Sequence, residues 1–261
     1  MYKLSFILLA LLNNEKKDSI DFIIAKYILE NVDDLRHISI VELSQACHVS
    51  KSTISRFCRK IGLEDFSEIK HELYNVNFYR DSKFHFELNN GDDSYLLKVA
   101  NQITKLHNYL DYNKINQLVK DIYKYPRVIT VGHMQSQLAA FHLQEELFIS
   151  RKITFCPSLY NLQLDYFKDC TKDDLIIVFS NEGGFFEKVF MRKLKINELK
   201  DPKIYFITSN NKVQYYDYTD EVILVPDNDD FISHPMQFNL VSNVIAQAYA
   251  TYCRNTEEGN M

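Results

Sequence analysis

The sequence has few residues of the kinds that cross-link a chain or bind metals. It contains five cysteines, an odd number, and they are scattered without a Cys-x-x-Cys pair. A disulfide framework or a structural zinc site would need cysteines paired at short, regular spacing. We therefore expect reduced cysteines, no metal and no other cofactor, as is usual for a protein of the reducing cytoplasm.

Long hydrophobic runs are also scarce. One segment, residues 4–12 after Lys3, is rich in leucine and is similar in composition to the hydrophobic part of a secretion signal. It is too short to span a bilayer, and the polar residues 13–17 follow it without a small-residue cleavage site. We expect instead a first helix that is buried or forms a dimer contact, no membrane partner, and a cytoplasmic location.

The chain has no excess of positive charge. Its formal net charge is −5 at pH 7, which excludes a uniformly basic nucleic-acid-binding protein but leaves room for a local basic surface. With 46% hydrophobic and 25% charged residues the composition is ordinary for a globular protein, and 261 residues are enough for two domains.

The pattern of residues changes along the chain. Residues 1–77 predict helices, residues 78–94 predict a linker, and in residues 95–261 short apolar strands alternate with helices. Such alternation predicts a parallel sheet covered by helices on both faces. We therefore expect an all-α domain followed by a three-layer α/β domain, with a helix at 185–199 and strands at 128–131, 153–156, 175–179, 204–208 and 222–225.

The most specific local pattern lies in residues 40–62, where two short helices joined by a tight turn are expected. Ser50 is suited to cap the second helix by accepting a hydrogen bond from the amide of Thr53. Ala46 is small enough to let the helices approach, and Val49 supplies an apolar residue for the turn. The second helix has one apolar face that would pack inward, formed by Ile54, Phe57, Cys58 and Ile61.

The opposite face of this second helix carries cations and small hydroxyl residues but no acid. Early residues of a recognition helix reach base edges, whereas later cations tend to hold phosphates. Arg56 is the best candidate for a bidentate contact to guanine. The alternative is a merely solvated helix face. The candidate contacts to bases or nearby phosphates are Lys51, Ser52, Thr53, Ser55 and Arg56, and the candidate phosphate contacts are Arg59 and Lys60.

These motifs resemble the DNA-binding domain of RpiR/MurR-type transcription regulators. The resemblance extends from Ser39 to Leu73, and its most specific part is the run Arg-Phe-Cys-Arg-Lys-x-Gly followed by Phe-Ser-Glu-x-Lys. It implies a helix-turn-helix domain that binds a double-stranded operator and a C-terminal SIS (sugar isomerase) domain that senses a phosphosugar. It further implies regulation of carbohydrate-metabolism genes by a homodimer or higher homo-oligomer.

The SIS resemblance places a candidate effector site in two turns at strand ends. SIS domains have a Gly-x-Gly-x-Ser turn and a Ser-x-Ser-Gly-x-Thr turn, whose hydroxyls and amides suit a phosphate. The candidate ligand-binding residues in the matching turns are Gly132, Gln135, Ser136, Ser180, Asn181, Glu182 and Gly183.

Three residues in these turns depart from the SIS pattern. Met134 replaces a glycine, Glu182 replaces a serine, and Phe185 replaces a threonine. A carboxylate would repel phosphate, and a phenyl ring removes a hydroxyl and occupies space. A neutral sugar, an amino sugar or no effector at all therefore remain alternatives, the last leaving the SIS domain as a dimerisation scaffold only.

An isomerase-like enzyme is the third alternative. Neither a nucleophile elbow, a metal-binding motif nor a P-loop is present, so we expect no catalytic residues. The titratable candidates for proton transfer are Glu145, Glu146, His133, His142 and His234.

Overall fold

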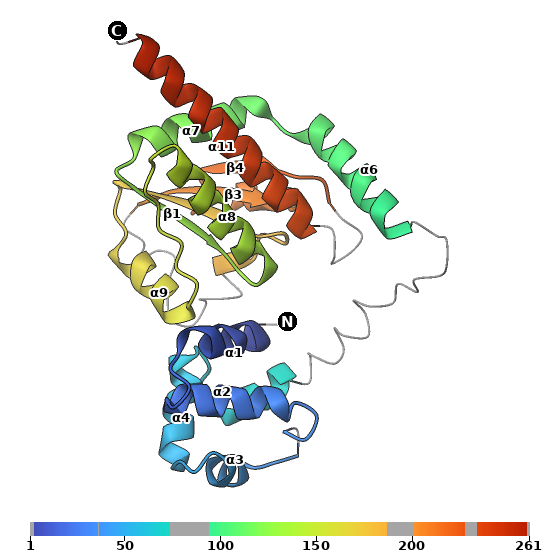
Figure 1. Ribbon diagram of the computed structural model, residues 1–261, viewed down its shortest axis with the longest axis vertical. Coiled ribbons are helices and arrows are strands. Elements are labelled where there is room, and N and C mark those ends of the chain that lie inside the picture. Colours follow the sequence, from blue (N-terminus) through green and yellow to red (C-terminus); the bar gives the residue numbers. More distant parts are fainter. Residues whose placement is uncertain (1–2, 36, 74–93, 187–200, 228–233, 260–261) are drawn as a thin grey trace. The chain divides into compact units, whose positions relative to one another are not determined.

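The computed structural model describes residues 3–35, 37–73, 94–186, 201–227 and 234–259 (Figure 1). The chain divides into two compact units. The first comprises Met1–Glu87 together with Ser158–Gln163, and the second comprises Leu88–Pro157 together with Leu164–Met261. Of the predicted linker 78–94, only Ser94 lies within the described residues.

The first unit is helical. The hydrophobic segment near the N-terminus forms the inner face of the first helix, since its side chains at Leu4, Leu8 and Leu11 are buried. This confirms the expectation of a buried first helix. The elements are α1 (Lys3–Asn14), α2 (Ile20–Glu30), α3 (Ile40–Ala46), α4 (Lys51–Lys60) and a further helical segment at 66–73.

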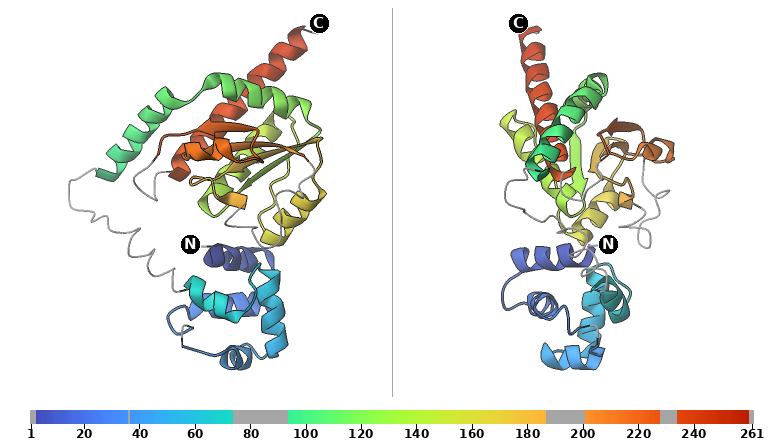
Figure 2. Two further views of the ribbon diagram at one scale, coloured as in Figure 1. Left: turned by 180° about the vertical axis from the view of Figure 1, so that it is seen from behind. Right: turned by 90° about the vertical axis from the view of Figure 1, so that its right-hand side faces the viewer.

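The second unit is built on a four-stranded parallel sheet in the order β1-β2-β3-β4 (Figure 2). The strands are β1 (Arg127–Gly132), β2 (Asp174–Phe179), β3 (Lys203–Thr208) and β4 (Glu221–Leu224). The other elements are α6 (Ser94–Tyr109), α7 (Tyr112–Lys124), α8 (Gln135–Ile149), α9 (Tyr160–Asp169), η2 (Asn211–Tyr215) and α11 (His234–Gly259).

The predicted strand at 153–156 is reduced to a single bridge. Phe155 pairs in parallel with Ile129, with hydrogen bonds from the Phe155 amide to the Val128 carbonyl and from the Thr130 amide to the Phe155 carbonyl. The bridge lies on the side of β1 away from β2. The chain therefore passes from β1 to one neighbouring position in the sheet and then, with β2, to the opposite side of β1. The gap between the ends of β1 and β2 is thus the topological switch point, where α/β sheets bind ligands.

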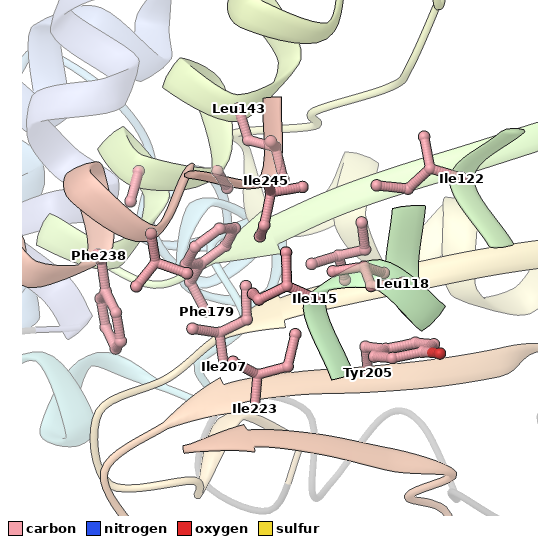
Figure 3. Close-up of a cluster of buried hydrophobic side chains, with 14 of the residues drawn as sticks. Ile115, Leu118, Ile122, Leu143, Phe179, Tyr205, Ile207, Ile223, Phe238 and Ile245 are labelled. Atoms are coloured by element: carbon pink, nitrogen blue, oxygen red, sulfur yellow. The ribbon is translucent and has the colours of Figure 1, made fainter. Parts of the chain in front are cut away.

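The sheet is buried on both faces. On one face, alternate residues such as Phe179, Tyr205 and Ile207 pack with α7, α8 and α11 (Figure 3). On the other, Phe186 makes edge-on ring contacts with Phe167 of α9 and with Phe206 of β3. Burial on both faces explains why the strands have continuous apolar sequences. Of the predicted helix 185–199, only residues 185 and 186 are described.

Candidate functional site

The turn between α3 and α4 has the geometry that the sequence predicts, with one addition. The Ser50 hydroxyl accepts a hydrogen bond from the Thr53 amide over 3.1 Å, which confirms the predicted cap. The Val49 amide donates to the Ser44 carbonyl over 2.9 Å and closes the turn. His48 has a φ of 54°, a left-handed conformation that glycine adopts more readily. No sequence signal indicated this, because the turn contains no glycine.

The inner face of α4 is as predicted, whereas the expected role of Ala46 is wrong. The four apolar side chains of α4 and its cap are at most 2% exposed. Ala46, however, is exposed, because it lies on the side of α3 away from Leu43 and Cys47. The small buried residue of α3 is Ser44, whose hydroxyl donates to the Val41 carbonyl over 2.7 Å.

The predicted DNA contacts share the outer surface of α4. Thr53 and Ser55 are half-buried, and the other five side chains are exposed. The Arg56 guanidinium donates to the Thr53 hydroxyl over 3.4 Å, and Arg59 donates to the Ser55 carbonyl over 3.2 Å. Since the Thr53 hydroxyl carries no charge, this contact leaves the charge of Arg56 available to an external anion.

Lys60 is held by carboxylates of other elements. Its ammonium forms ion pairs with Glu15, at 3.2 Å, and with Asp21 in the first turn of α2. The hydrogen bond to Asp21 raises the pKa of Lys60 above its usual value. These contacts hold the end of α4 against α2, so a phosphate would compete with two carboxylates for this side chain.

The turns after β1 and β2 lie side by side. Gly132, the last residue of β1, is in register with Phe179, the last residue of β2. The structure therefore brings the predicted residues 132–136 and 180–183 to the same edge of the sheet, at the switch point. Ser136 is buried, Ser180 is half-buried and Glu182 is exposed.

The turn after β1 is tightly constrained. A Cβ atom on Gly132 would lie 2.5 Å from the carbonyl carbon and oxygen of Ser136, so only glycine fits there. Met134, which stands where the SIS pattern has its second glycine, has a φ of 57° and a ψ of −121°. Non-glycine residues held in such regions carry strain of about 1–3 kcal/mol. The N-terminus of α8 follows directly and has no side-chain cap.

Gln137 is a residue of this turn that sequence reasoning missed. Its side-chain carbonyl accepts a hydrogen bond from the Gly132 amide over 3.1 Å, and its amide group donates to the Pro157 carbonyl over 3.3 Å and to Cys156 Sγ over 3.0 Å. Burial raises the pKa of the Cys156 thiol to about 11, so the thiol is protonated at neutral pH. Gln137 thus uses a backbone donor that a ligand anion would otherwise bind.

The turn after β2 is held by residues at the end of β3. The Asn181 carbonyl accepts hydrogen bonds from the hydroxyls of Thr208, at 3.0 Å, and Ser209, at 2.9 Å. The Asn181 side-chain oxygen Oδ1 is buried without a hydrogen-bond partner in the described part of the chain. Gly183 has a φ of 75°, and a Cβ atom there would lie 2.1 Å from Val213 Cγ2.

The phenyl ring of Phe185 was expected to occupy space in the candidate site, but it lies in the core instead. Its side chain is buried and makes edge-on contacts with Phe167 and Phe186, at ring-centroid distances of 6.0 Å and 5.3 Å. Phenylalanine is favoured here because it completes the aromatic core under the sheet. The loss of a hydroxyl donor at this position nevertheless remains.

Two of the residues considered for catalysis lie along α8. Glu145 is exposed on α8, and His142 forms a 2.9 Å hydrogen bond with the Asn243 side chain of α11. The side chain of His234 lies outside the described residues. Within the ranges that the structure describes, no group of three His, Cys, Asp or Glu residues is arranged to hold a metal ion. The same ranges contain no helix that is both long and apolar enough to cross a membrane.

The fold and the α4 surface together define a helix-turn-helix unit joined to a parallel α/β unit. Residues 8–76 match the helix-turn-helix domain of the rpiR family, and the first unit therefore contains a domain of that family. The chain is 24% identical to the HTH-type transcriptional regulator GlvR of Bacillus subtilis, over 89% of this chain and 90% of GlvR. Three other curated relatives are HTH-type transcriptional regulators, and the matches span 60%, 17% and 49% of their lengths.

The fold is similar to those of two solved structures. The NanR protein of Vibrio vulnificus, complexed with ManNAc-6P, has a TM-score of 0.53 and 16% identity, over 98% of this chain and 94% of NanR. An Escherichia coli CFT073 protein, also solved as a complex, has a TM-score of 0.52 and 16% identity, over 64% of this chain and 94% of that one. The predicted SIS-like α/β fold of the second unit is thus confirmed.

Proposed function

We propose that this protein is a sequence-specific transcription regulator whose helix α4 reads a double-stranded DNA operator. The observation that carries this proposal is the outer face of α4, where cations and hydroxyl groups follow a capped helix start and α4 itself contains no acidic residue. In such helices the first residues reach base edges and later cations hold phosphates. Arg56, which is exposed in the second turn, would make the guanine contact.

Residues 1–77 would form the DNA-binding domain, residues 78–94 the linker, and residues 95–261 the sensor and dimerisation domain. Two copies would act as a cytoplasmic homodimer on a pseudo-palindromic operator, because a symmetric dimer presents two recognition helices to two half-sites. The kinship with HTH-type transcriptional regulators supports this regulatory role.

The second unit would sense a sugar or a sugar phosphate, which connects the regulator with carbohydrate metabolism. The candidate residues meet at the switch point of the sheet, and the N-terminus of α8, whose helix dipole favours an anion, begins at the same edge. The similarity of fold to NanR, which was solved with ManNAc-6P, also supports a sugar-phosphate class of effector. Sensing requires binding alone, so no catalytic residue is assigned.

A ligand-independent scaffold is the second candidate, and the hydrogen bonds of the two turns favour it. The amides of Gly132, Ser180 and Gly183 all donate within the protein, to Gln137, Ile207 and Ser180 respectively. Glu182 adds a carboxylate to the same edge. Each feature lowers the affinity that this edge can offer to a phosphate.

DNA reading is tested by selecting bound duplexes from a pool of random sequence and then measuring affinities for the selected duplex. Arg56→Ala should weaken binding by about 1–3 kcal/mol and relax the preference at one base position, without loss of thermal stability. Lys26→Ala, which removes an exposed cation from α2, should leave affinity almost unchanged. Enrichment of no sequence by the wild-type protein would refute the proposal.

Effector sensing is tested by thermal unfolding with a panel of phosphorylated, neutral and amino sugars. A ligand at 100 times its dissociation constant stabilises the folded state by about 2.7 kcal/mol, which gives a clear rise in melting temperature. A rise with one phosphosugar supports the sensor, and a rise with a neutral or amino sugar would assign Glu182 a selective role. No rise with any sugar would leave the scaffold.

A further inference from the structure

Helix α8 is apolar on two sides. Its inner side chains, such as Leu143 and Leu147, are buried against the sheet. Four large apolar side chains on its outer side are 57–72% exposed, namely Leu138, Phe141, Phe148 and Ile149. Because an α-helix has 3.6 residues per turn, these four positions lie within one face. A helix that is apolar on both sides is typical of one packed between two partners.

The exposed face continues onto the edge of the sheet. Gln144 donates from its side chain to the Thr154 carbonyl over 2.6 Å and so ties α8 to the edge segment. On that segment Ile153 is 67% exposed and Phe155 is 37% exposed. Taking about 150–250 Å² for a large apolar side chain, the six exposed side chains present roughly 540–900 Å². This range lies at or above the largest apolar patches of typical monomers and includes the ~800 Å² that each partner buries in a stable dimer.

We infer that this face is the surface on which a second copy of the chain docks, with the two α8 helices antiparallel across a two-fold axis. The inference rests on the proposed function only in that a dimer supplies two recognition helices. A two-fold interface requires a self-complementary surface. Phe141 and Phe148 are equally distant from the midpoint between Gln144 and Glu145, so antiparallel helices would bring each phenyl ring against the other ring of the partner subunit.

The charge on the outer side of α8 makes this arrangement testable. Glu145 is exposed between Phe141 and Phe148 on the outer side of α8. In the antiparallel arrangement the two Glu145 carboxylates lie beside the axis and repel each other. Neutralising them should therefore tighten the dimer, whereas a cation introduced at a phenylalanine position should break it.

The test is sedimentation velocity on the full chain as a function of concentration. Phe148→Lys and Phe141→Lys should each raise the dissociation constant of the self-association at least 10-fold, and Glu145→Gln should lower it several-fold. Tyr215→Lys, at a side chain that is 78% exposed on η2, is the matched control and should have no effect. Circular dichroism and melting temperature establish that each variant is folded. A monomeric wild type, or α8 variants that self-associate as the wild type does, would overturn the inference.

Cross-linking identifies the occupant of the surface. Glu145→Cys places a thiol beside the axis and should give a disulfide-linked dimer under mild oxidation, whereas the wild type and Lys120→Cys on α7 should not. Absence of the cross-link contradicts the antiparallel arrangement. Failure of this inference differs from failure of the proposed function, because the selected DNA duplex would still be bound while the α8 substitutions left self-association unchanged.

Discussion

Two candidate sites are constructed in opposite ways. The first is the outer surface of α4 with the proposed DNA contacts, here called the α4 surface, and the second is the candidate effector site in the turns after β1 and β2, here called the strand-end site. The α4 surface consists of ten consecutive residues, and its cap and inner face are set by contacts within a few positions. The strand-end site joins turns after three different strands, from Gly132 to Asn210, through hydrogen bonds between residues far apart in the chain. A local site survives changes elsewhere in the fold, whereas a composite site changes whenever one of its turns moves.

Both sites contain a non-glycine residue with positive φ, but with different consequences. His48 lies in the turn before α4, where it shapes the approach of two helices. Met134 lies inside the candidate effector site and replaces a residue that the SIS pattern has as glycine. Strain at the second position therefore bears directly on whether the site still accepts a ligand.

The largest loss of stability is expected from a substitution at Gly132 in the strand-end site. Gly132→Ala would force a Cβ atom to within 2.5 Å of backbone atoms of Ser136, which cannot move without displacing α8. We expect a loss of about 3 kcal/mol in the free energy of unfolding, measured by urea denaturation. An unchanged midpoint would contradict the constraint inferred for this turn.

The next effect is a gain. Met134→Gly should relieve strain of about 1–3 kcal/mol, less about 0.5–1 kcal/mol for the added freedom of glycine in the unfolded chain. We expect the free energy of unfolding to rise by about 1 kcal/mol, which urea denaturation would show as a higher midpoint concentration. Lys120→Gly on the exposed side of α7 is the control and should destabilise by about 1 kcal/mol. Equal destabilisation by both substitutions would show that Met134 is not strained.

At the α4 surface a smaller loss is expected from the cap. Ser50→Ala removes the acceptor for the Thr53 amide and should cost about 1 kcal/mol of stability. It should also weaken DNA binding, because the first turn of α4 carries the proposed base contacts. Ser52→Ala removes a neighbouring exposed hydroxyl that hydrogen-bonds with the Ser50 hydroxyl over 2.7 Å but caps no backbone amide, so it should cost less stability than Ser50→Ala. Equal stability losses would refute the assignment of the cap.

The smallest effect distinguishes two cations at the end of α4. Lys60→Met should lower stability by about 0.5 kcal/mol, since it removes partly exposed ion pairs to Glu15 and Asp21. Arg59→Met should instead reduce the salt dependence of DNA binding by about one phosphate contact. If Lys60→Met gives the larger reduction in salt dependence, the original phosphate assignment for Lys60 stands.

Much of the architecture could be predicted because its signals are local. Alternating apolar strands and helices predicted the parallel sheet, and β1 to β4 lie within a few residues of their expected positions. The prediction of a strand at 153–156 was too long, because only Phe155 of this segment forms a β-bridge with a strand of the sheet. Its outward-facing side chains are the ones that we assign to the dimer surface.

What the sequence alone determined is the α4 surface: helix periodicity and the Ser50 cap together decide which side chains point outward. Only the tertiary structure decided that Lys60 pairs with carboxylates of other elements, that Gln137 occupies the Gly132 amide, and that Phe185 belongs to the core. The physical reason is the range of the interactions. Capping and helical spacing act within four residues, whereas partners from other elements meet only after the chain has folded.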